Sequence, residues 1–149
     1  MQKENLSLNI QYGLALLAAP IFCLVYIEIF QHKADDIFWL LNDTKSLFFL
    51  IFLYPLIEEL TFRGVIQEYI NQKTKQWKLF LSISIANLLT SILFVLMHFV
   101  HHVPTWALLT FFPSLVFGYF KERYDHIAPS IILHMFYNLC FFSFIGLRL

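Results

Sequence analysis

Residues 47–70 read LFFLIFLYPLIEELTFRGVIQEYI, an apolar run whose middle holds two carboxylates and an arginine. A helix needs about 20 consecutive apolar residues to cross the hydrocarbon layer of a bilayer, and this run is long enough. Ionisable side chains inside such a span are costly, and they generally face a protein interior or a functional cavity. The stretch therefore predicts a transmembrane helix that carries a polar site.

Four further apolar stretches cover residues 10–30, 79–100, 105–120 and 127–147. The chain of 149 residues is 59% hydrophobic and 13% charged, against about 25% charged in a typical soluble domain. These features predict an all-α, polytopic transmembrane helix bundle of about five membrane-associated helices. We expect one integral membrane domain over residues 1–149, with a motif-bearing core at about 47–142. The first stretch is too long for a signal peptide and predicts an N-terminal anchor helix at about 10–30.

The charges of the chain limit its partners and predict its orientation. The formal net charge is zero, so the chain lacks the basic balance that nucleic-acid binding requires. If all five helices cross, one side carries more cationic residues than the other: Lys3, Lys73, Lys75, Lys78, Lys121 and Arg123 against Lys33, Lys45 and Arg148. Because cytoplasmic loops are enriched in Lys and Arg, we expect the N-terminus in the cytoplasm.

Helical geometry separates the charged residues of the second stretch. Glu59 and Arg63 are four residues apart and share a helix face, so they can form an ion pair that lowers the cost of burying both. Glu58 points elsewhere, along the face of Phe62, and Pro55 upstream removes one backbone donor. The alternative is that this helix stops at Ile57, which would leave both carboxylates in the headgroup layer.

Two other apolar stretches also carry polar side chains. His98 lies near the end of the third stretch, and His134 and Asn138 are four residues apart in the fifth. Each histidine alone could be a satisfied core residue. Polar groups on three separate apolar helices are better explained by convergence on one buried cavity. His101 and His102 could add metal ligands, although an interfacial position beside Pro104 is favoured.

Together these residues resemble a known family, the CAAX protease and bacteriocin-processing family of glutamate-type intramembrane endopeptidases. The resemblance lies in three motifs on successive apolar segments: Glu58-Glu59-x-x-x-Arg63, Phe94-x-x-x-His98 and His134-x-x-x-Asn138. It implies hydrolysis of a peptide bond in a membrane-anchored or C-terminal-tail protein, with no cofactor and no metal. It also implies an integral protein of the prokaryotic cell (inner) membrane.

The resemblance also implies a role for each motif residue. Glu58 would be the general base, and His98 would hold the attacking water. His134 and Asn138 would donate hydrogen bonds to the oxyanion. Supporting roles fall to Glu59 and Arg63, which would position the helix and tune the local field.

Two other classes of function remain open on the sequence. A zinc-dependent membrane protease could use the same Glu and His residues, although the HExxH spacing is absent. A transporter or membrane partner protein could use the buried carboxylates and histidines as a proton relay. Sensitivity to a chelator would distinguish a zinc-dependent protease from a metal-free one. Ion flux without proteolysis would identify a transporter.

Overall fold

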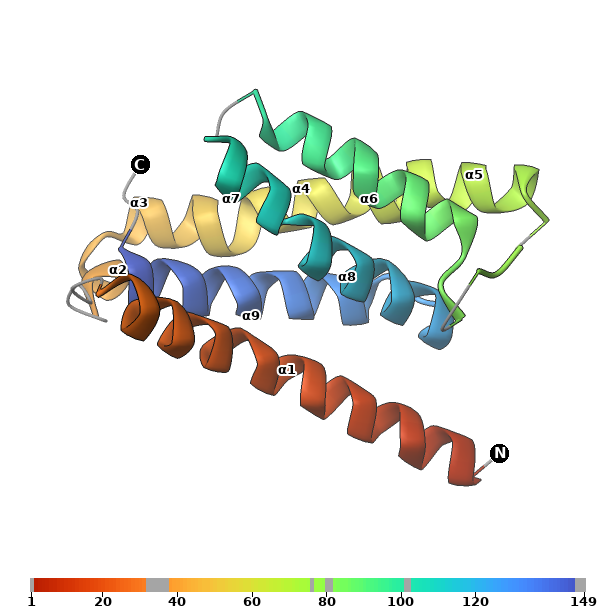
Figure 1. Cartoon of the computed structure of the whole chain (residues 1–149), viewed down its shortest axis with the longest axis horizontal. Coiled ribbons are helices and arrows are strands. Elements are labelled where there is room, and N and C mark those ends of the chain that lie inside the picture. The colour runs from red at the N-terminus through yellow and green to blue at the C-terminus, as the bar shows by residue number, and fades with distance from the viewer. Residues whose placement is uncertain (1, 32–37, 76, 80–81, 101–102, 147–149) are drawn as a thin grey trace. The chain divides into compact units, whose positions relative to one another are not determined.

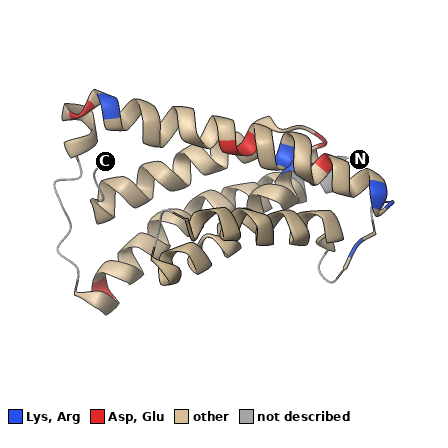
Figure 2. Ribbon diagram, turned by 90° about the horizontal axis from the view of Figure 1, so that it is seen from above, with Lys and Arg blue, Asp and Glu red and all other residues tan. Residues whose placement is uncertain are grey.

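The computed structural model describes residues 2–31, 38–75, 77–79, 82–100 and 103–146, with side chains from residue 7 onward. The structure is 86% helical, and no strand occurs among the described residues (Figure 1). Figure 2 shows that most of the ribbon between helix ends carries neither acidic nor basic residues. These observations confirm the predicted all-α helical bundle.

The chain forms a series of helices with one long continuous helix near its middle. α1 (Gln2–Phe30) is followed by a short α2 (Trp39–Asn42). The long helix comprises α3 (Thr44–Ser46), η1 (Leu47–Leu53), α4 (Tyr54–Glu59), η2 (Leu60–Gln67) and α5 (Glu68–Lys73). Next come α6 (Ile85–His98), α7 (Pro104–Leu109), α8 (Phe111–Tyr124) and α9 (Ala128–Ile145).

The long helix contains two π-helical segments, η1 and η2, on either side of α4. A π-helix pairs each N–H with the carbonyl five residues back, and it is rare and often found at functional sites. The bond from the Tyr54 N–H to the Phe49 carbonyl has this spacing. The Glu58-Glu59 turn is therefore enclosed by two segments of unusual helical pitch.

The observed helices agree only in part with the five predicted spans. Within the described residues, two helical stretches are long and apolar enough to cross a bilayer, Ser7–Phe30 and Ala128–Ile145. The third span, predicted from residue 79, begins instead at Ile85, because Ser84 accepts a hydrogen bond from the Asn87 N–H and caps the helix.

The fourth predicted span, residues 105–120, is divided. α7 begins at Pro104, α8 begins after a break at Thr110, and α8 continues to Tyr124. Asp125 adopts a left-handed conformation (φ 52°), which ends α8. The prediction of a single continuous span at this place is therefore wrong, and the helix ends four residues beyond its approximate predicted boundary.

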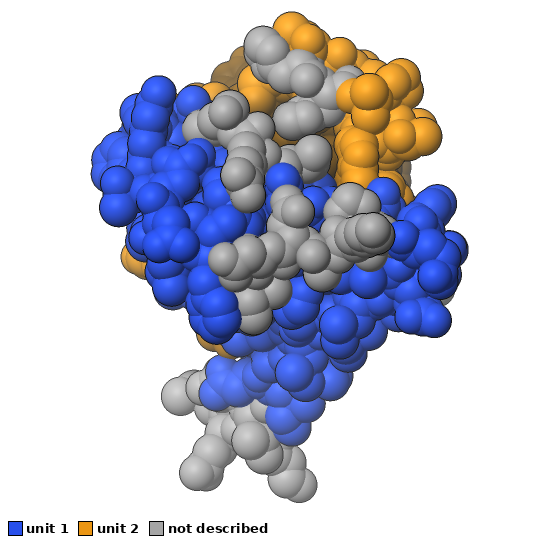
Figure 3. All heavy atoms as spheres, turned by 90° about the vertical axis from the view of Figure 1, so that its left-hand side faces the viewer, with its two compact units in different colours: residues 1–56, 132–149 blue, residues 57–131 orange. Residues whose placement is uncertain are grey.

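The helices group into two compact units, coloured in Figure 3. Unit 1 comprises residues 1–56 and 132–149, and unit 2 comprises residues 57–131. One cluster in the core of unit 1 joins Ala19, Cys23 and Cys140. Large apolar side chains along α1, such as Leu14 and Ile21, are more than half exposed, as expected for a lipid-facing helix.

Candidate active site

The ion pair predicted between Glu59 and Arg63 is present. Arg63 Nε lies 3.2 Å from Glu59 Oε2, and both side chains have no exposed surface. Arg63 Nη2 also donates a hydrogen bond of 2.7 Å to Ser114 Oγ on α8. The helix continues through this pair to Lys73, so the alternative in which it stops at Ile57 does not hold.

Glu58, the neighbouring carboxylate, is in a different environment. Its side chain is partly exposed, whereas that of Glu59 is fully buried. Glu58 and Phe62 are four residues apart, on one face of the helix. The Phe62 ring makes an edge contact with Phe94 on α6, with ring centroids 5.0 Å apart. The face that carries Glu58 therefore leads, within unit 2, to the C-terminal turn of α6.

His98 occupies that turn, and its ring orientation is fixed. The His98 ring lies 4.4 Å from the Phe94 ring, and its Nδ1 is 2.9 Å from the Phe94 carbonyl oxygen. Because a carbonyl oxygen can only accept a hydrogen bond, Nδ1 carries the proton. In the neutral imidazole Nε2 then has a lone pair and accepts hydrogen bonds.

Phe94 connects His98 to the ion pair as well. The Arg63 guanidinium carbon lies 5.5 Å from the centre of the Phe94 ring, within the range of a cation–π interaction. Unit 2 thus brings together Glu59, Arg63, Phe62, Phe94 and His98.

His134 and Asn138 lie on the part of α9 that belongs to unit 1. His134 is buried, with 5% of its surface exposed. Asn138 is partly exposed, and its Nδ2 donates a hydrogen bond of 2.9 Å to the Leu50 carbonyl oxygen. His134 and Asn138 belong to unit 1, whereas Glu58 and His98 belong to unit 2, so the convergence of all four residues stays a prediction.

Unit 2 also holds a set of polar residues, most of them buried, that sequence reasoning missed. Gln67 Nε2 donates to the Gly118 carbonyl and to Glu122 Oε1, and Ser84 Oγ donates to the same Glu122 oxygen. Asn87 Nδ2 donates to the Leu115 carbonyl. Together with the ion pair and Ser114, these residues form a set that we call the polar seam: Glu59, Arg63, Gln67, Ser84, Asn87, Ser114 and Glu122.

A repeated spacing of four could have revealed the polar seam. Glu59, Arg63 and Gln67 follow one another at this interval on the long helix, and Ser114 and Gly118 do so on α8. Small residues four apart allow helix backbones to approach closely in membrane proteins. The polar seam is therefore where α6, α8 and η2 pack together.

The described residues contain no group of three His, Cys, Asp or Glu side chains close enough to hold a metal ion. His101 and His102, which the sequence offered as further ligands, lie outside the described residues, as do Lys33 and Arg148.

Comparison with known families identifies the chain. A family model described as type II CAAX prenyl endopeptidase Rce1-like matches residues 40–140, which include all six predicted site residues. Searches of curated proteins and of solved structures gave no match. The family is membrane-embedded, in agreement with the two long apolar helices. Because the match covers more than half of the sequence, the chain is a membrane protein of the protease class and belongs to the Rce1-like family of type II CAAX prenyl endopeptidases.

Proposed function

We propose that the chain is an intramembrane endopeptidase that hydrolyses a peptide bond by means of a glutamate-activated water. The substrate is a membrane-anchored protein or one with a C-terminal tail in the bilayer. The observation that carries this proposal is the contrast between adjacent carboxylates: Glu59 is buried in an ion pair with Arg63, and Glu58 is partly exposed on the face that leads to His98. The negative charge of Glu59 is thus balanced by Arg63, and Glu58 has exposed surface that water and a substrate can reach.

In this proposal Glu58 and His98 act on one water molecule. The His98 Nε2 lone pair accepts a hydrogen bond from the water, and the ionised Glu58 takes its proton as the oxygen attacks the scissile carbonyl carbon. Protonated Glu58 then returns that proton to the leaving nitrogen as the C–N bond breaks. No covalent intermediate with the protein is required, because the nucleophile is water.

His134 and Asn138 are proposed as the oxyanion site. Each can donate an N–H hydrogen bond to the negatively charged oxygen of the tetrahedral intermediate. Removal of one such donor costs about 2.7–4 kcal/mol of transition-state stabilisation in enzymes where this has been measured. We expect a loss of this order in kcat for Asn138→Ala.

The experiment that tests the function compares the membrane proteomes of cells that express the wild type or Glu58→Gln. Mass spectrometry of protein termini should find at least one membrane protein whose terminus is produced by the wild type only. Glu28→Gln is the matched control, because Glu28 is exposed on α1 outside the matched family region. An identical set of termini with the wild type and with Glu58→Gln would contradict the proposal.

Cleavage of the substrate found in that experiment, measured with purified protein, separates the metal-free mechanism from a zinc-dependent one. Turnover should be unchanged after chelation and dialysis. Loss of turnover that Zn²⁺ restores would favour the zinc protease.

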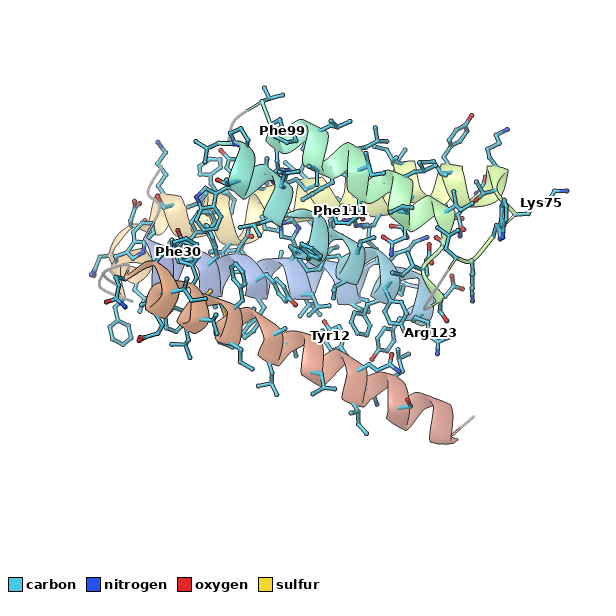
Figure 4. All side chains as sticks on the ribbon, in the orientation of Figure 1. Tyr12, Phe30, Lys75, Phe99, Phe111 and Arg123 are labelled. Atoms are coloured by element: carbon cyan, nitrogen blue, oxygen red, sulfur yellow. The ribbon has the colours of Figure 1, made fainter. Side chains whose placement is uncertain are left out.

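We also propose a location, the inner membrane of a prokaryotic cell, with the N-terminus in the cytoplasm. Lys121 forms an ion pair with Glu68, so the C-terminal part of α8 and α5 lie at the same end of unit 2. Figure 4 shows Lys75 and Arg123 at this end and Phe99 toward the other. The cationic residues that the positive-inside rule assigns to the cytoplasm therefore gather at one end of unit 2.

A further inference from the structure

In the π-helical pairing of η1, the residue that would donate to the Leu50 carbonyl is a proline. In η1 the Tyr54 N–H pairs with the Phe49 carbonyl, five residues back. The same pairing for the next residue would join the N–H of residue 55 to the Leu50 carbonyl. Residue 55 is a proline, which has no N–H. Pro55 thus cannot supply the backbone donor that this pairing assigns to the Leu50 carbonyl.

That carbonyl lies where water is scarce. Pro55 is fully buried, and only 6% of the Leu50 surface is exposed. A buried carbonyl without a partner costs about as much as a lost hydrogen bond, and more inside a membrane. Asn138 supplies the partner, because its Nδ2 donates to the Leu50 oxygen at 2.9 Å.

The preceding residue of α9 makes a similar contact. The Tyr137 hydroxyl donates a hydrogen bond of 2.9 Å to the Ala15 carbonyl on α1. Ala15 lies five residues before Pro20, which is inside α1. In an α-helix such as α1, Pro20 removes the donor to the carbonyl four residues back, so the Tyr137 contact to Ala15 does not replace a bond that this proline removes. Of these two contacts, the Asn138 contact is therefore the one made to a carbonyl whose donor a proline removes.

We propose that Asn138 is a positioning residue, whose carboxamide replaces the N–H that Pro55 lacks and thereby anchors the turn leading to Glu58. Pro55 lies three residues before Glu58 in the same continuous helix. The carboxamide has two N–H donors, so one holds Leu50 and the other stays available to an oxyanion. The consequence for catalysis rests on the function proposed above, whereas the hydrogen bond itself does not.

A double-mutant cycle in purified protein tests this inference. Asn138→Leu removes the donor with little change in volume and should lower the melting temperature. Pro55→Ala restores a backbone N–H to Leu50, so Asn138→Leu in that background should lose less than half as many degrees. Tyr137→Phe is the control, because it removes a neighbouring hydrogen bond of α9 and should cost the same in both backgrounds. Equal losses for Asn138→Leu in both backgrounds would overturn the inference.

The Leu50 carbonyl can also be observed directly by NMR. Labelling Leu with carbonyl ¹³C and Ile with ¹⁵N selects two bonds in this sequence, Leu50–Ile51 and Leu56–Ile57. Asn138→Leu should move the Leu50 ¹³C signal to lower frequency, as loss of a hydrogen bond does, and leave the Leu56 signal in place. In the Pro55→Ala background, adding Asn138→Leu should leave the Leu50 ¹³C signal at its position. An unmoved signal in the Pro55 background would overturn the inference, and neither readout requires proteolytic activity.

Discussion

Arg63 makes three kinds of contact from one buried side chain: an ion pair with Glu59, a hydrogen bond to Ser114 and a cation–π contact with Phe94. A buried charge is tolerated only when it is paired and hydrogen-bonded. Arg63 therefore supplies the counter-charge to Glu59, and it links the long helix to α6 and α8. The stability of unit 2 should depend strongly on this residue.

Removing Arg63 alone should be more harmful than removing the whole ion pair. Arg63→Ala leaves Glu59 buried without its partner, which costs about 3–5 kcal/mol, whereas Glu59→Leu combined with Arg63→Met should cost less. Chemical unfolding in detergent measures both values. Arg123→Ala, at an exposed position of α8, should have little effect. Equal stability of Arg63→Ala and the wild type would mean that the ion pair contributes nothing.

The interactions of single residues were predictable where they are local. Glu59 and Arg63 are four residues apart, so helix periodicity alone places them together. Ser114 lies 51 residues from Arg63, and the spacing of four within each helix does not by itself pair one of these residues with the other. Asn138 was predicted as an oxyanion donor, but its bond to Leu50 depends on π-helical pairing that the sequence does not reveal.

The start of the long helix depends on Asp43. Its Oδ1 accepts a hydrogen bond from the Ser46 N–H at 3.1 Å, and its Oδ2 accepts one from Ser46 Oγ at 2.7 Å. The hydrogen bond from the Ser46 backbone, followed by that from its side chain, lowers the pKa of the Asp43 carboxyl below its ordinary value. The ionised form is therefore the one that caps the helix.

This lowered pKa predicts how stability changes with pH. The contribution of Asp43 is fully present above its pKa in the unfolded chain, and it is lost as the pH falls through the lower pKa of the folded protein. Asp43→Asn keeps a capping side chain that does not titrate. The melting temperature of the wild type should fall relative to this variant as the pH drops from 7 toward 3. A constant difference across this range would contradict the prediction.

The packing of α8 against α6 and η2 requires a glycine. A Cβ added to Gly118 would lie 2.0 Å from Asn87 Oδ1 and 2.8 Å from Gln67 Oε1. Asn87 cannot move away freely, because its amide bonds the Leu115 carbonyl and its oxygen accepts from Ser91. The absence of a side chain at position 118 therefore allows the close approach of these helices.

Gly118→Ala should consequently destabilise the protein by about 1–3 kcal/mol, the usual cost of overpacking a core. Gly13→Ala is the control, because nothing lies within 4 Å of its added Cβ and Ala favours a helix more than Gly does. Thermal unfolding should rank Gly13→Ala at or above the wild type and Gly118→Ala below it. Two variants of equal stability would show that the helices do not pack closely at Gly118.

At the level of helices, apolar runs identified which segments are helical but not where each one begins. α6 starts at Ile85 because Ser84 caps it, although apolar residues extend back to position 79. α7 and α8 are separate helices within a run that reads as continuous. Hydrophobicity reports the length of an apolar run, whereas caps and tertiary contacts set the ends of a helix.

The orientation of the whole molecule follows from the proposed cytoplasmic position of the cationic loops. In a background where Cys23 and Cys140 are replaced by Ala, Val103→Cys should react with an impermeant maleimide added to intact cells. Lys73→Cys should react only after the membrane is opened. Both positions are exposed, so accessibility reports the side of the membrane. The opposite pattern would invert the orientation of unit 2 and place Lys73 outside.

The shortness of α6 has a consequence for the lipid around the molecule. A helix of 14 residues is about 21 Å long, whereas the hydrocarbon layer is about 30 Å thick. Bilayers adjust to a short apolar helix by thinning locally, at a cost that grows with their thickness. We expect the melting temperature to be higher in myristoyl than in erucoyl phosphatidylcholine bilayers, and equal values would mean that α6 does not set the local thickness. Under the proposed function, a thinned layer beside α6 would also bring water closer to the backbone of a substrate helix, so lipid composition would control the rate of cleavage.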